Sequence, residues 1–427
     1  MGEQLQNISW IVRHDLCVGC GICQDICPKK AIQIKSVNGL FNPVVDENLC
    51  INNKGCYRCR TVCPGGGVKL VELSKNAFGT EKGIKRDQYI GQYISCYSGY
   101  SNDYNLRYYG ASGGMVSQFL IYLLEEGYIQ GAVVTRFSKE KEFWVDTFVA
   151  KNRKEILSAK SSKYCPVTMA GLSTQLKQLE GKYAIVGLPC HLHGLRKLAE
   201  VDKNFSKKIF TFIGLYCSCG RNFSLTEYVF KSRGIDLEDV DFFTYRQERG
   251  MGKMLAIGKQ NEKDFKMNIP FQDYYLTLRS YFNVRRCMHC VDHFAELGDI
   301  CFGDIHTGKY IDDKIGISSM VTRNKCMDDI LQNMAKEGVV TICPVSKEEL
   351  LNSQKYVKTK KHLNPSYMKI DHLLGKETPD YDVVFQDMPI YKVFKSYIVK
   401  IVQMFIGRHK KLHWLVKLMS KNMKNWK

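Results

Sequence analysis

The fold of this chain is decided by Cys17-Val-Gly-Cys20-Gly-Ile-Cys23-Gln-Asp-Ile-Cys27-Pro28 and a second stretch, Cys50 … Cys56-Tyr-Arg-Cys59-Arg-Thr-Val-Cys63-Pro64. In the first stretch the cysteines are separated by two, two and three residues, and a proline follows. This spacing binds [4Fe-4S] clusters in pairs, because the fourth cysteine of each run ligates the other cluster. We therefore predict two clusters. One is held by Cys17, Cys20, Cys23 and Cys63, and the other by Cys27, Cys50, Cys56 and Cys59.

The second stretch departs from the pattern, because Asn52-Asn53-Lys54-Gly55 widens its first gap to five residues. Its final Cys-x-x-x-Cys-Pro is intact, which predicts a longer loop and a complete cluster. The alternatives are a zinc site, which needs one pair of cysteine pairs, or disulfides, which need an oxidising compartment. No signal peptide precedes the run, so we expect neither. Residues 8–75 resemble the two-cluster bacterial ferredoxins.

Length and charge limit the classes of protein. A chain of 427 residues suggests two or three domains, and no apolar run approaches the ~18–20 residues of a membrane span. The formal charge of +19 falls by about two for each bound cluster. A basic balance suits acidic redox partners or anionic lipid. No nucleic-acid-binding motif is present, so we expect no nucleic-acid partner and a cytoplasmic protein, with a peripheral position on the inner membrane as an option.

After residues 1–75 and a Gly-containing linker over 76–95, strands alternate with helices. Residues 183–190 and 208–217 both read as a buried strand that ends at a cysteine. Alternation of this kind predicts a larger α/β domain with a mostly parallel or mixed sheet, which follows an α+β ferredoxin-like N-terminal domain along the chain. We divide the rest of the chain into 96–180, 181–340, a peripheral segment 341–390 and a basic helical tail 391–427.

A third set of cysteines lies in the larger domain. Ligands of parallel sheets bind outside the carboxyl ends of the strands, where Cys190 and Cys217 are expected. With Cys287 and Cys290 they make four thiols, the number that a third [4Fe-4S] cluster needs. Buried inert cysteine, a redox dithiol or a zinc site are the alternatives. Further cysteines are either ambiguous or expected to be inert: Cys165, Cys219 and Cys301 in the first class, and Cys96, Cys326 and Cys343 in the second.

Three short polar stretches are candidates for binding an organic ligand. Ser112-Gly113-Gly114 precedes an apolar helix, whose free N–H groups could hold a phosphate. Lys163 could neutralise a phosphate, and Tyr164 could stack on a ring. Asp304 ends a short strand, where its carboxylate could meet a ring nitrogen or a hydroxyl. A capped turn, an ordinary loop and a turn aspartate are the respective structural alternatives.

Five stretches carry a resemblance to a known family: residues 112–115, 162–164, 187–196, 214–217 and 287–304. Residues 95–335 resemble the beta-subunit family of the coenzyme F420 hydrogenases and dehydrogenases, which includes plant hydroxymethyl-chlorophyll and divinyl-chlorophyllide reductases. The most specific stretch is Cys287 to Asp304, and this chain departs from the family pattern there at Gly298 and Cys301.

The resemblance implies one [4Fe-4S] cluster in this domain beside a bound FAD, or beside another flavin or a deazaflavin. It also implies that two electrons pass between this cofactor and a deazaflavin or a small organic substrate. Flavin or substrate contacts are then expected from the three polar stretches, namely Ser112, Gly113, Gly114, Lys163, Tyr164 and Asp304. Candidate proton donors, which a reduction of C=C or C=O needs, are His191, His193 and His289. A single histidine is more often structural.

The resulting prediction is an iron-sulfur flavoprotein oxidoreductase that receives single electrons from a redox protein, a ferredoxin or a reductase. The alternatives are a non-catalytic electron-transfer subunit of a larger complex and a membrane-surface scaffold. In the tail, residues 391–427 hold ten Lys or Arg and no Asp or Glu, with apolar residues at helical spacing and Trp414 and Trp426 as anchors. Such a helix pair either lies on an anionic membrane or packs on the protein body.

Overall fold

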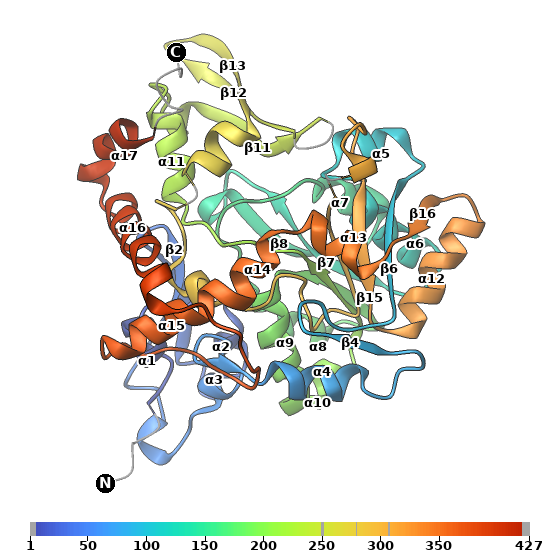
Figure 1. The fold of residues 1–427 in the computed structure, drawn as a ribbon, viewed down its shortest axis with the longest axis horizontal. Helices are drawn as coiled ribbons and strands as arrows, with labels where there is room; N and C mark the ends of the chain where they lie inside the picture. Colours follow the sequence, from blue (N-terminus) through green and yellow to red (C-terminus); the bar gives the residue numbers. More distant parts are fainter. Residues whose placement is uncertain (1–5, 249–251, 279, 306–307, 421–427) are drawn as a thin grey trace.

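The computed structural model describes residues 6–248, 252–278, 280–305 and 308–420, and shows a small N-terminal unit beside a larger α/β body (Figure 1). Trp426 lies outside the described residues. In the N-terminal unit, β1 (Ile32–Val37) and β2 (Leu40–Val45) form an antiparallel hairpin. The other elements of this unit are α1 (Ser9–Arg13), α2 (Ile22–Asp25), η1 (Asn52–Lys54), α3 (Arg58–Thr61), β3 (Gly67–Val68) and α4 (Leu70–Phe78).

The N-terminal unit ends in a short strand followed by a helix. The strand is β3, which pairs in parallel with β17 (Asp380–Tyr381), more than 300 residues further along the chain. The chain then turns into α4, because the carboxylate of Asp382 accepts the N–H groups of Val71 and Glu72, both at 2.9 Å. An acceptor at a helix N-terminus satisfies donors that have no partner within the helix.

The expected linker over residues 76–95 has structure of its own. It contains the end of α4 and a small antiparallel hairpin of β4 (Lys85–Asp87) and β5 (Gly91–Tyr93). Gly91 has a φ of +80°, a left-handed conformation that glycine adopts without strain. The linker is therefore an ordered connection to the main sheet.

The body is built on a mixed eight-stranded sheet of order β16-β6-β15-β14-β10-β9-β7-β8. Its centre is parallel, as the buried strand pattern predicts, and antiparallel strands flank it on both sides. The strands are β6 (Ser95–Ser101), β7 (Gly131–Phe137), β8 (Val145–Ala150), β9 (Tyr183–Gly187), β10 (Ile209–Leu215), β14 (Ile300–Asp304), β15 (Ser318–Thr322) and β16 (Val340–Pro344).

Alternate residues of these strands pack on opposite faces, which gives the sheet two separate cores. Ile185 packs in the core that contains Leu192 and Leu195, whereas Ala184 packs in the core that contains Phe119 and Leu331. The first core includes residues of α8 (Leu172–Gln178), α9 (Pro189–Val201) and α10 (Lys203–Ser206), together with α2 and α4 of the N-terminal unit. The second core includes residues of α5 (Tyr104–Tyr109), α6 (Met115–Glu125), α7 (Arg153–Ser158) and α12 (Lys325–Lys336). Coverage of both faces is the usual reason for a parallel centre.

A second, three-stranded antiparallel sheet was not expected from the sequence. Its strands are β11 (Val240–Gln247), β12 (Lys253–Gln260) and β13 (Lys263–Pro270), in that order. It packs with α11 (Ser224–Lys231) and the π-helix η4 (Gln272–Leu276) in a core rich in aromatic rings. This sheet carries Arg246 to the end of the main sheet.

Residues 341–390, expected to be peripheral, are partly buried against the cysteines of the body. They form α13 (Lys347–Ser353), α14 (Tyr356–Lys358), the π-helix η7 (Thr359–Leu363) and α15 (Asn364–Leu373). Lys360, Lys361 and Asn364 in this segment are buried polar residues. Their polar ends pair with the region of Cys287 to Glu296, which explains why charged side chains are accepted in the interior.

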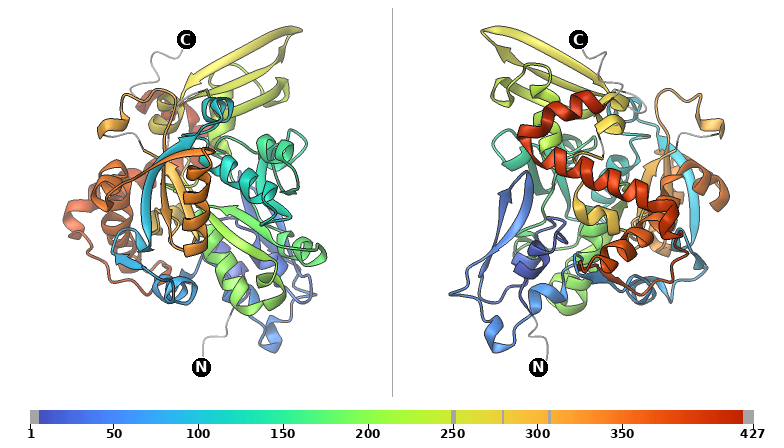
Figure 2. Two further views of the ribbon diagram at one scale, coloured as in Figure 1. Left: turned by 90° about the vertical axis from the view of Figure 1, so that its right-hand side faces the viewer. Right: turned by 60° about the vertical axis from the view of Figure 1, so that its left-hand side comes forward.

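The tail forms two helices, α16 (Ile390–Arg408) and α17 (His413–Met419), joined by η8 (Lys410–Leu412). The right-hand view of Figure 2 shows α16 lying on the outside of the molecule, in contact with α15 and α11. The ion pair of Arg408 with Asp15, at 3.2 Å, joins the end of α16 to the N-terminal unit. Within the described residues, no helix is long and apolar enough to span a membrane.

Candidate functional site

The first cysteine quartet gathers as the spacing predicts. Gly21, with a φ of +80°, turns the chain into α2, which places Cys20 and Cys23 on one side of a tight loop. Burial and the charge of Cys63 raise the pKa of the Cys17 thiol to about 12. Burial, Cys20 and Cys63 also raise the pKa of Cys23. The thiols of Cys17, Cys20 and Cys23, whose ionisation is opposed by neighbouring cysteines, suit a positively charged iron core.

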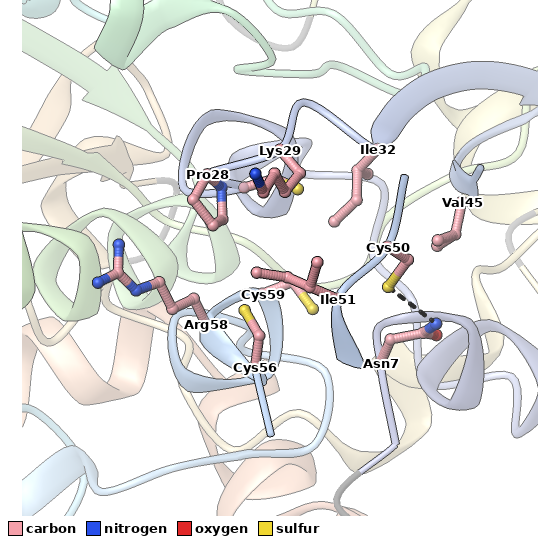
Figure 3. A pocket seen from close by; sticks show the side chains of 11 residues that line it. Asn7, Pro28, Lys29, Ile32, Val45, Cys50, Ile51, Cys56, Arg58 and Cys59 are labelled. Atoms are coloured by element: carbon pink, nitrogen blue, oxygen red, sulfur yellow. Dashed lines mark hydrogen bonds between the residues drawn. The ribbon is translucent and has the colours of Figure 1, made fainter. Parts of the chain in front are cut away.

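The second quartet lines a cavity in the N-terminal unit (Figure 3). Cys27, Cys50, Cys56 and Cys59 share it with the apolar side chains of Ile32, Val45 and Ile51. The widened gap of this stretch forms η1, whose Asn52 side chain donates to the carbonyl oxygen of Cys56 at 2.8 Å. The longer loop therefore still brings all four cysteines to one place.

N–H groups donate to cysteine sulfurs in both quartets. The backbone donors are Gly19 to Cys17 at 3.4 Å, Gly65 to Cys63 at 3.2 Å and Ala31 to Cys27 at 3.3 Å, and the Asn7 side chain donates to Cys50 at 3.7 Å. Donors of this kind stabilise cluster thiolates and tune the reduction potential. The residues present therefore fit two iron-sulfur clusters.

Five cysteines, one more than expected, meet outside the carboxyl ends of β9 and β10. They are Cys190 in the first turn of α9, Cys217 and Cys219 after β10, and Cys287 and Cys290 in and after η5 (Arg285–His289). Burial and the charges of Cys217 and Cys290 raise the pKa of Cys190 to about 12. A hydrogen bond from Cys287 lowers the pKa of Cys219 to about 6. Cys219 therefore belongs to this group.

Cys301, the other ambiguous cysteine, lies elsewhere. Its sulfur accepts a hydrogen bond from Arg323 Nη1 at 2.9 Å and donates to the carbonyl oxygen of Ala295 at 3.1 Å. Cys165 lies in the aromatic core, apart from the five-cysteine group. Neither Cys301 nor Cys165 therefore belongs to the five-cysteine group.

The surroundings of the five-cysteine group supply donors and positive charge. The Gly220 N–H donates to the sulfur of Cys287 at 3.2 Å, and Lys360 Nζ donates to the sulfur of Cys290 at 3.0 Å. Lys360 comes from η7 and is buried. A buried ammonium beside thiolates offsets the net negative charge of a four-thiolate cluster. The donor set fits a third [4Fe-4S] cluster.

The three cysteine groups lie in series, and the first quartet is the middle one. Cys59 of the second quartet raises the pKa of Cys23, after burial and the other cysteines of its own quartet. On the other side, Cys190 is among the charges that raise the pKa of Cys20, after burial and Cys63. Lys197 of α9 also donates to the carbonyl oxygen of Cys63 at 2.8 Å.

The turn at Ser112-Gly113-Gly114 is fixed by the protein itself. Ser112 Oγ donates to the carbonyl oxygen of Ile317 at 2.7 Å, and the Gly113 N–H donates to Ser318 Oγ at 3.0 Å. A Cβ at Gly113 would lie 2.7 Å from the carbonyl oxygen of Gly99, so this residue must be small. These contacts account for the turn without a ligand.

The next two predicted residues have different surroundings. Lys163 Nζ donates to the carbonyl oxygens of Lys160 and Ser161 at 2.9 and 3.0 Å, just beyond the end of α7, and burial lowers its pKa to about 7. The ring of Tyr164 instead lies in an aromatic group, with its centroid 4.4 Å from that of Tyr275. Burial raises the pKa of the Tyr164 hydroxyl to about 12.

Asp304 ends β14 and pairs with Arg246 of β11, at 2.9 and 3.3 Å. This ion pair joins the main sheet to the three-stranded sheet. Both partners lie close enough to Tyr164 to influence the pKa of its hydroxyl, after burial. Tyr164, Arg246 and Asp304 therefore form one polar and aromatic group at the end of β14.

Arg221 is a candidate site residue that no pattern in the sequence indicated. It is buried, its guanidinium lies 4.4 Å from the Tyr275 ring centroid, and its Nη1 donates to Asn283 Oδ1 at 2.8 Å. Its Nε and Nη2 have no hydrogen-bond partner within the described part of the chain. A buried guanidinium with unpaired donors fits an anionic or polar ligand. The one feature of the sequence that could have pointed to Arg221 is its position two residues after Cys219.

Tyr275 connects the cysteines to this polar and aromatic group. Its hydroxyl is 3.2 Å from Ser218 Oγ, between Cys217 and Cys219, and its ring contacts both Arg221 and Tyr164. Phe271 stacks on the same ring at 4.5 Å. An organic ring bound here would lie directly beside the third cysteine group.

The three predicted proton donors are buried. His193 Nε2 lies 2.8 Å from Asp292 Oδ2, and His289 Nε2 lies 2.7 Å from Asp371 Oδ2. The ring of His191 accepts the N–H of Leu188 at 3.4 Å. Burial lowers the pKa of His191 and of His289 to about 4, and also lowers that of His193. These contacts describe structural roles, and proton donation by any of the three stays a prediction.

Family models match three parts of the chain. Residues 96–173 match the N-terminal model of the coenzyme F420 hydrogenase/dehydrogenase beta subunit, and residues 180–348 match its C-terminal model. Residues 16–66 match a 4Fe-4S dicluster domain. Together the two beta-subunit models cover more than half of the chain.

Individual relatives agree with these models. The chain is 27% identical over 349 residues to the coenzyme F420-dependent sulfite reductase of Methanocaldococcus jannaschii. The matched region is 78% of this chain but only 48% of the reductase. It is also 27% identical to the coenzyme F420 hydrogenase subunit beta of Methanothermobacter thermautotrophicus, over 64% of this chain and 95% of that subunit. The chain therefore spans about half the length of the first relative and nearly all of the second.

A solved structure has a similar fold. It is a chain of the F420-reducing [NiFe] hydrogenase complex from Methanosarcina barkeri, studied as a xenon derivative. The TM-score is 0.54 at 23% identity, and the similarity covers 69% of this chain and 98% of that one. The similarity supports the architecture of the body around the main sheet.

Proposed function

We propose, because this chain belongs to the coenzyme F420 hydrogenase/dehydrogenase beta-subunit family, that it is an iron-sulfur flavoprotein oxidoreductase. The observation that carries the proposal is the series of three cysteine groups that ends beside Arg221, Tyr275 and Tyr164. Bound clusters would supply one-electron transfer, and a bound flavin would supply the exchange between one- and two-electron chemistry.

In this proposal three sets of cysteines would each hold one cluster, and the three clusters would lie one after another. Three ligand sets are assigned: Cys27, Cys50, Cys56 and Cys59 at the outer end; Cys17, Cys20, Cys23 and Cys63 in the middle; and Cys190, Cys217, Cys287 and Cys290 at the inner end. Cys219 is the alternative ligand in the third set, because it hydrogen-bonds Cys287. Lys360 balances charge at this inner end.

Arg221 and Tyr275 are the proposed flavin contacts nearest the inner cysteines. The unpaired guanidinium donors suit carbonyl or phosphate oxygens, and the Tyr164 ring, which is only partly buried, suits contact with a flat ring. Asp304, held by Arg246, lies near the Tyr164 hydroxyl. Ser112 to Gly114 and Lys163 would support this site through the backbone they fix, because their side chains and N–H groups already have partners.

The outer end of the series would receive electrons from an acidic one-electron carrier. Lys29 and Arg58 line the second quartet's cavity, and both are exposed (Figure 3). Lys30, Lys54 and Tyr57 are exposed on the same two loops. Residues 26–71 contain seven Lys or Arg against two acidic residues, Asp46 and Glu47, so this surface favours a negatively charged protein.

The substrate at the flavin end is proposed as a deazaflavin or a small organic molecule. The relatives named for coenzyme F420 support a deazaflavin. The second candidate function is that of a non-catalytic electron-transfer subunit. It is supported by the 95% coverage of a relative that is named as a subunit.

Anaerobic purification with iron, sulfide and flavin determination tests the proposal. We expect about twelve iron atoms per chain, at four per cluster, and a flavin absorption band. About eight iron atoms and no flavin would contradict it and would leave an electron carrier with two clusters. Turnover of reduced deazaflavin or an artificial acceptor by the chain alone would distinguish the enzyme from a subunit that needs its complex.

A further inference from the structure

Helix α16 has two separate apolar faces. The inner face is buried against the body through Val393, Tyr397 and Met404. The outer face carries Tyr391, Phe394, Ile398, Val402 and Phe405, whose exposed fractions are 78%, 48%, 42%, 46% and 55%. Intervals of three and four residues place these five side chains in one stripe along the helix.

The same character continues into α17. Trp414 and Leu418 are four residues apart and are 64% and 68% exposed. Soluble surfaces carry single exposed apolar residues, but seven of them on two consecutive helices, five of which form one stripe, mark an interaction surface. We name the outer stripe of α16 together with Trp414 and Leu418 the tail face.

Charge indicates what the tail face binds. Residues 391–427 contain ten Lys or Arg and no Asp or Glu. Lys392 and Lys395 are exposed beside the stripe, and Lys411 and Lys417 are exposed on and after η8. The few acidic partners in this region come from other elements, as Asp15 does for Arg408 and Glu227 for Lys410.

We propose that the tail face binds an anionic membrane surface, with α16 lying in the plane of the interface. An occupant must accept a row of apolar and aromatic side chains and also meet a border in which Lys and Arg outnumber acidic residues. A bilayer with anionic headgroups provides both, because acyl chains lie directly below the charged layer. The tail face begins at Tyr391 and includes Trp414 in α17, and such rings favour the headgroup level.

Flotation of the full-length holoprotein with vesicles tests the proposal. The vesicles are phosphatidylcholine alone or phosphatidylcholine with phosphatidylglycerol. We expect recovery with the anionic vesicles and little with the neutral ones, with binding that weakens as salt is raised. The double variant Ile398→Ser/Phe405→Ser should reduce the partition coefficient about tenfold, because it removes two groups that would enter the acyl boundary.

A matched control replaces two exposed apolar residues with Ser on another surface of the protein. Phe242 and Ile257 are 45% and 41% exposed on β11 and β12, so Phe242→Ser/Ile257→Ser should float like the wild type. Lys392→Glu/Lys395→Glu should lower recovery with anionic vesicles by about fivefold or more and should not raise it with neutral ones.

Two results would overturn the proposal. One is equal flotation of wild type and Ile398→Ser/Phe405→Ser with anionic vesicles. The other is absence of flotation together with a concentration-dependent dimer that the same variant abolishes, which would assign the tail face to a second copy of the chain. Unchanged iron content in the variants shows that the body has kept its fold.

Discussion

Arg286 donates a hydrogen bond from Nη2 to the carbonyl oxygen of Pro64 at 3.0 Å. Its Nε donates to the carbonyl oxygen of Gly65 at 2.9 Å, and the side chain is buried. Arg286 precedes Cys287, and Pro64 follows Cys63, so one side chain joins the loops of two cysteine groups. The spacing between the middle and inner groups is therefore set by a charged contact as well as by apolar packing.

Replacing Arg286 with Ala should loosen this junction. Two carbonyl groups would lose a charged donor, which costs about 2 kcal/mol or more when the groups are buried. We expect faster hydrogen exchange over residues 62–68 and slower reduction of the inner group by an external donor, with iron content unchanged. Arg86→Ala, at an exposed position in β4, is the control. Unchanged exchange in Arg286→Ala would contradict the assignment.

Cysteine substitutions separate the inner group from its neighbours. Cys190→Ser should lose about four iron atoms per chain and keep about eight. Cys301→Ser should keep all of them, because Cys301 pairs with Arg323 and Ala295 instead. Iron and sulfide determination with electron paramagnetic resonance of the reduced protein makes the comparison, and Cys219→Ser shows which thiol is the fourth ligand. Equal iron loss in the Cys190 and Cys301 variants would contradict the placement.

Arg221→Gln should lower flavin content. The change removes a buried cation whose Nε and Nη2 are unpaired within the described residues, and we expect at least about tenfold weaker flavin binding. Flavin released by acid, measured per iron atom, gives the result independently of folding yield. Arg153→Ala, 44% exposed at the start of α7, is the control. Flavin retention equal to the wild type would remove Arg221 from the site.

Charge reversal on the outer loops should impair electron entry. Lys29→Glu/Lys54→Glu places two negative charges beside the second quartet, so we expect the KM for an acidic ferredoxin to rise about tenfold at low salt. The difference should shrink at high salt, because screening removes it. Lys336→Glu, exposed on α12, is the control. An unchanged KM in the double variant would place electron entry elsewhere.

Mild acid should weaken the packing of α17 against the body. His413 lies against Tyr228 and Phe282, and its Nε2 is 3.0 Å from the carbonyl oxygen of Gly407. Burial lowers its pKa below the ordinary 6.5. The unfolded segment therefore binds more protons than the folded one below that pH, and stability falls as pH falls.

Limited proteolysis of the tail measures this effect. We expect faster cleavage after residue 408 at pH 5.5 than at pH 7.5, and a smaller difference in His413→Gln, which does not titrate. Equal pH dependence in both proteins would assign the effect to other groups.

Local patterns predicted the parts of the site that lie close together in sequence. The spacing of Cys17 to Cys27 and the buried strand before Cys190 were sufficient, because tight loops and parallel strand ends have few alternative geometries. Lys360 and Asp382 could not be predicted in the same way. They meet Cys290 and α4 through long-range packing, and an isolated lysine or aspartate carries no signal of that contact.

The three-stranded sheet shows the same limit. Its residues alternate well enough for strands, but nothing in the sequence places Arg246 opposite Asp304, 58 positions away. The expectation that residues 341–390 are peripheral failed for a related reason. Their lysines look like surface residues until Glu296 and Cys290 are seen beside them.

The pairing of β3 with β17 and the cap that Asp382 provides to α4 also bear on biosynthesis. The cysteines of residues 17–63 leave the ribosome first, and an N-terminal unit can begin to fold while synthesis continues. Its last strand and helix nevertheless wait for residues 380–382, and the inner cysteine group waits for Lys360. Iron delivered during translation would meet two quartets early, and the third group only after Lys360, more than four-fifths of the way along the chain, has been made.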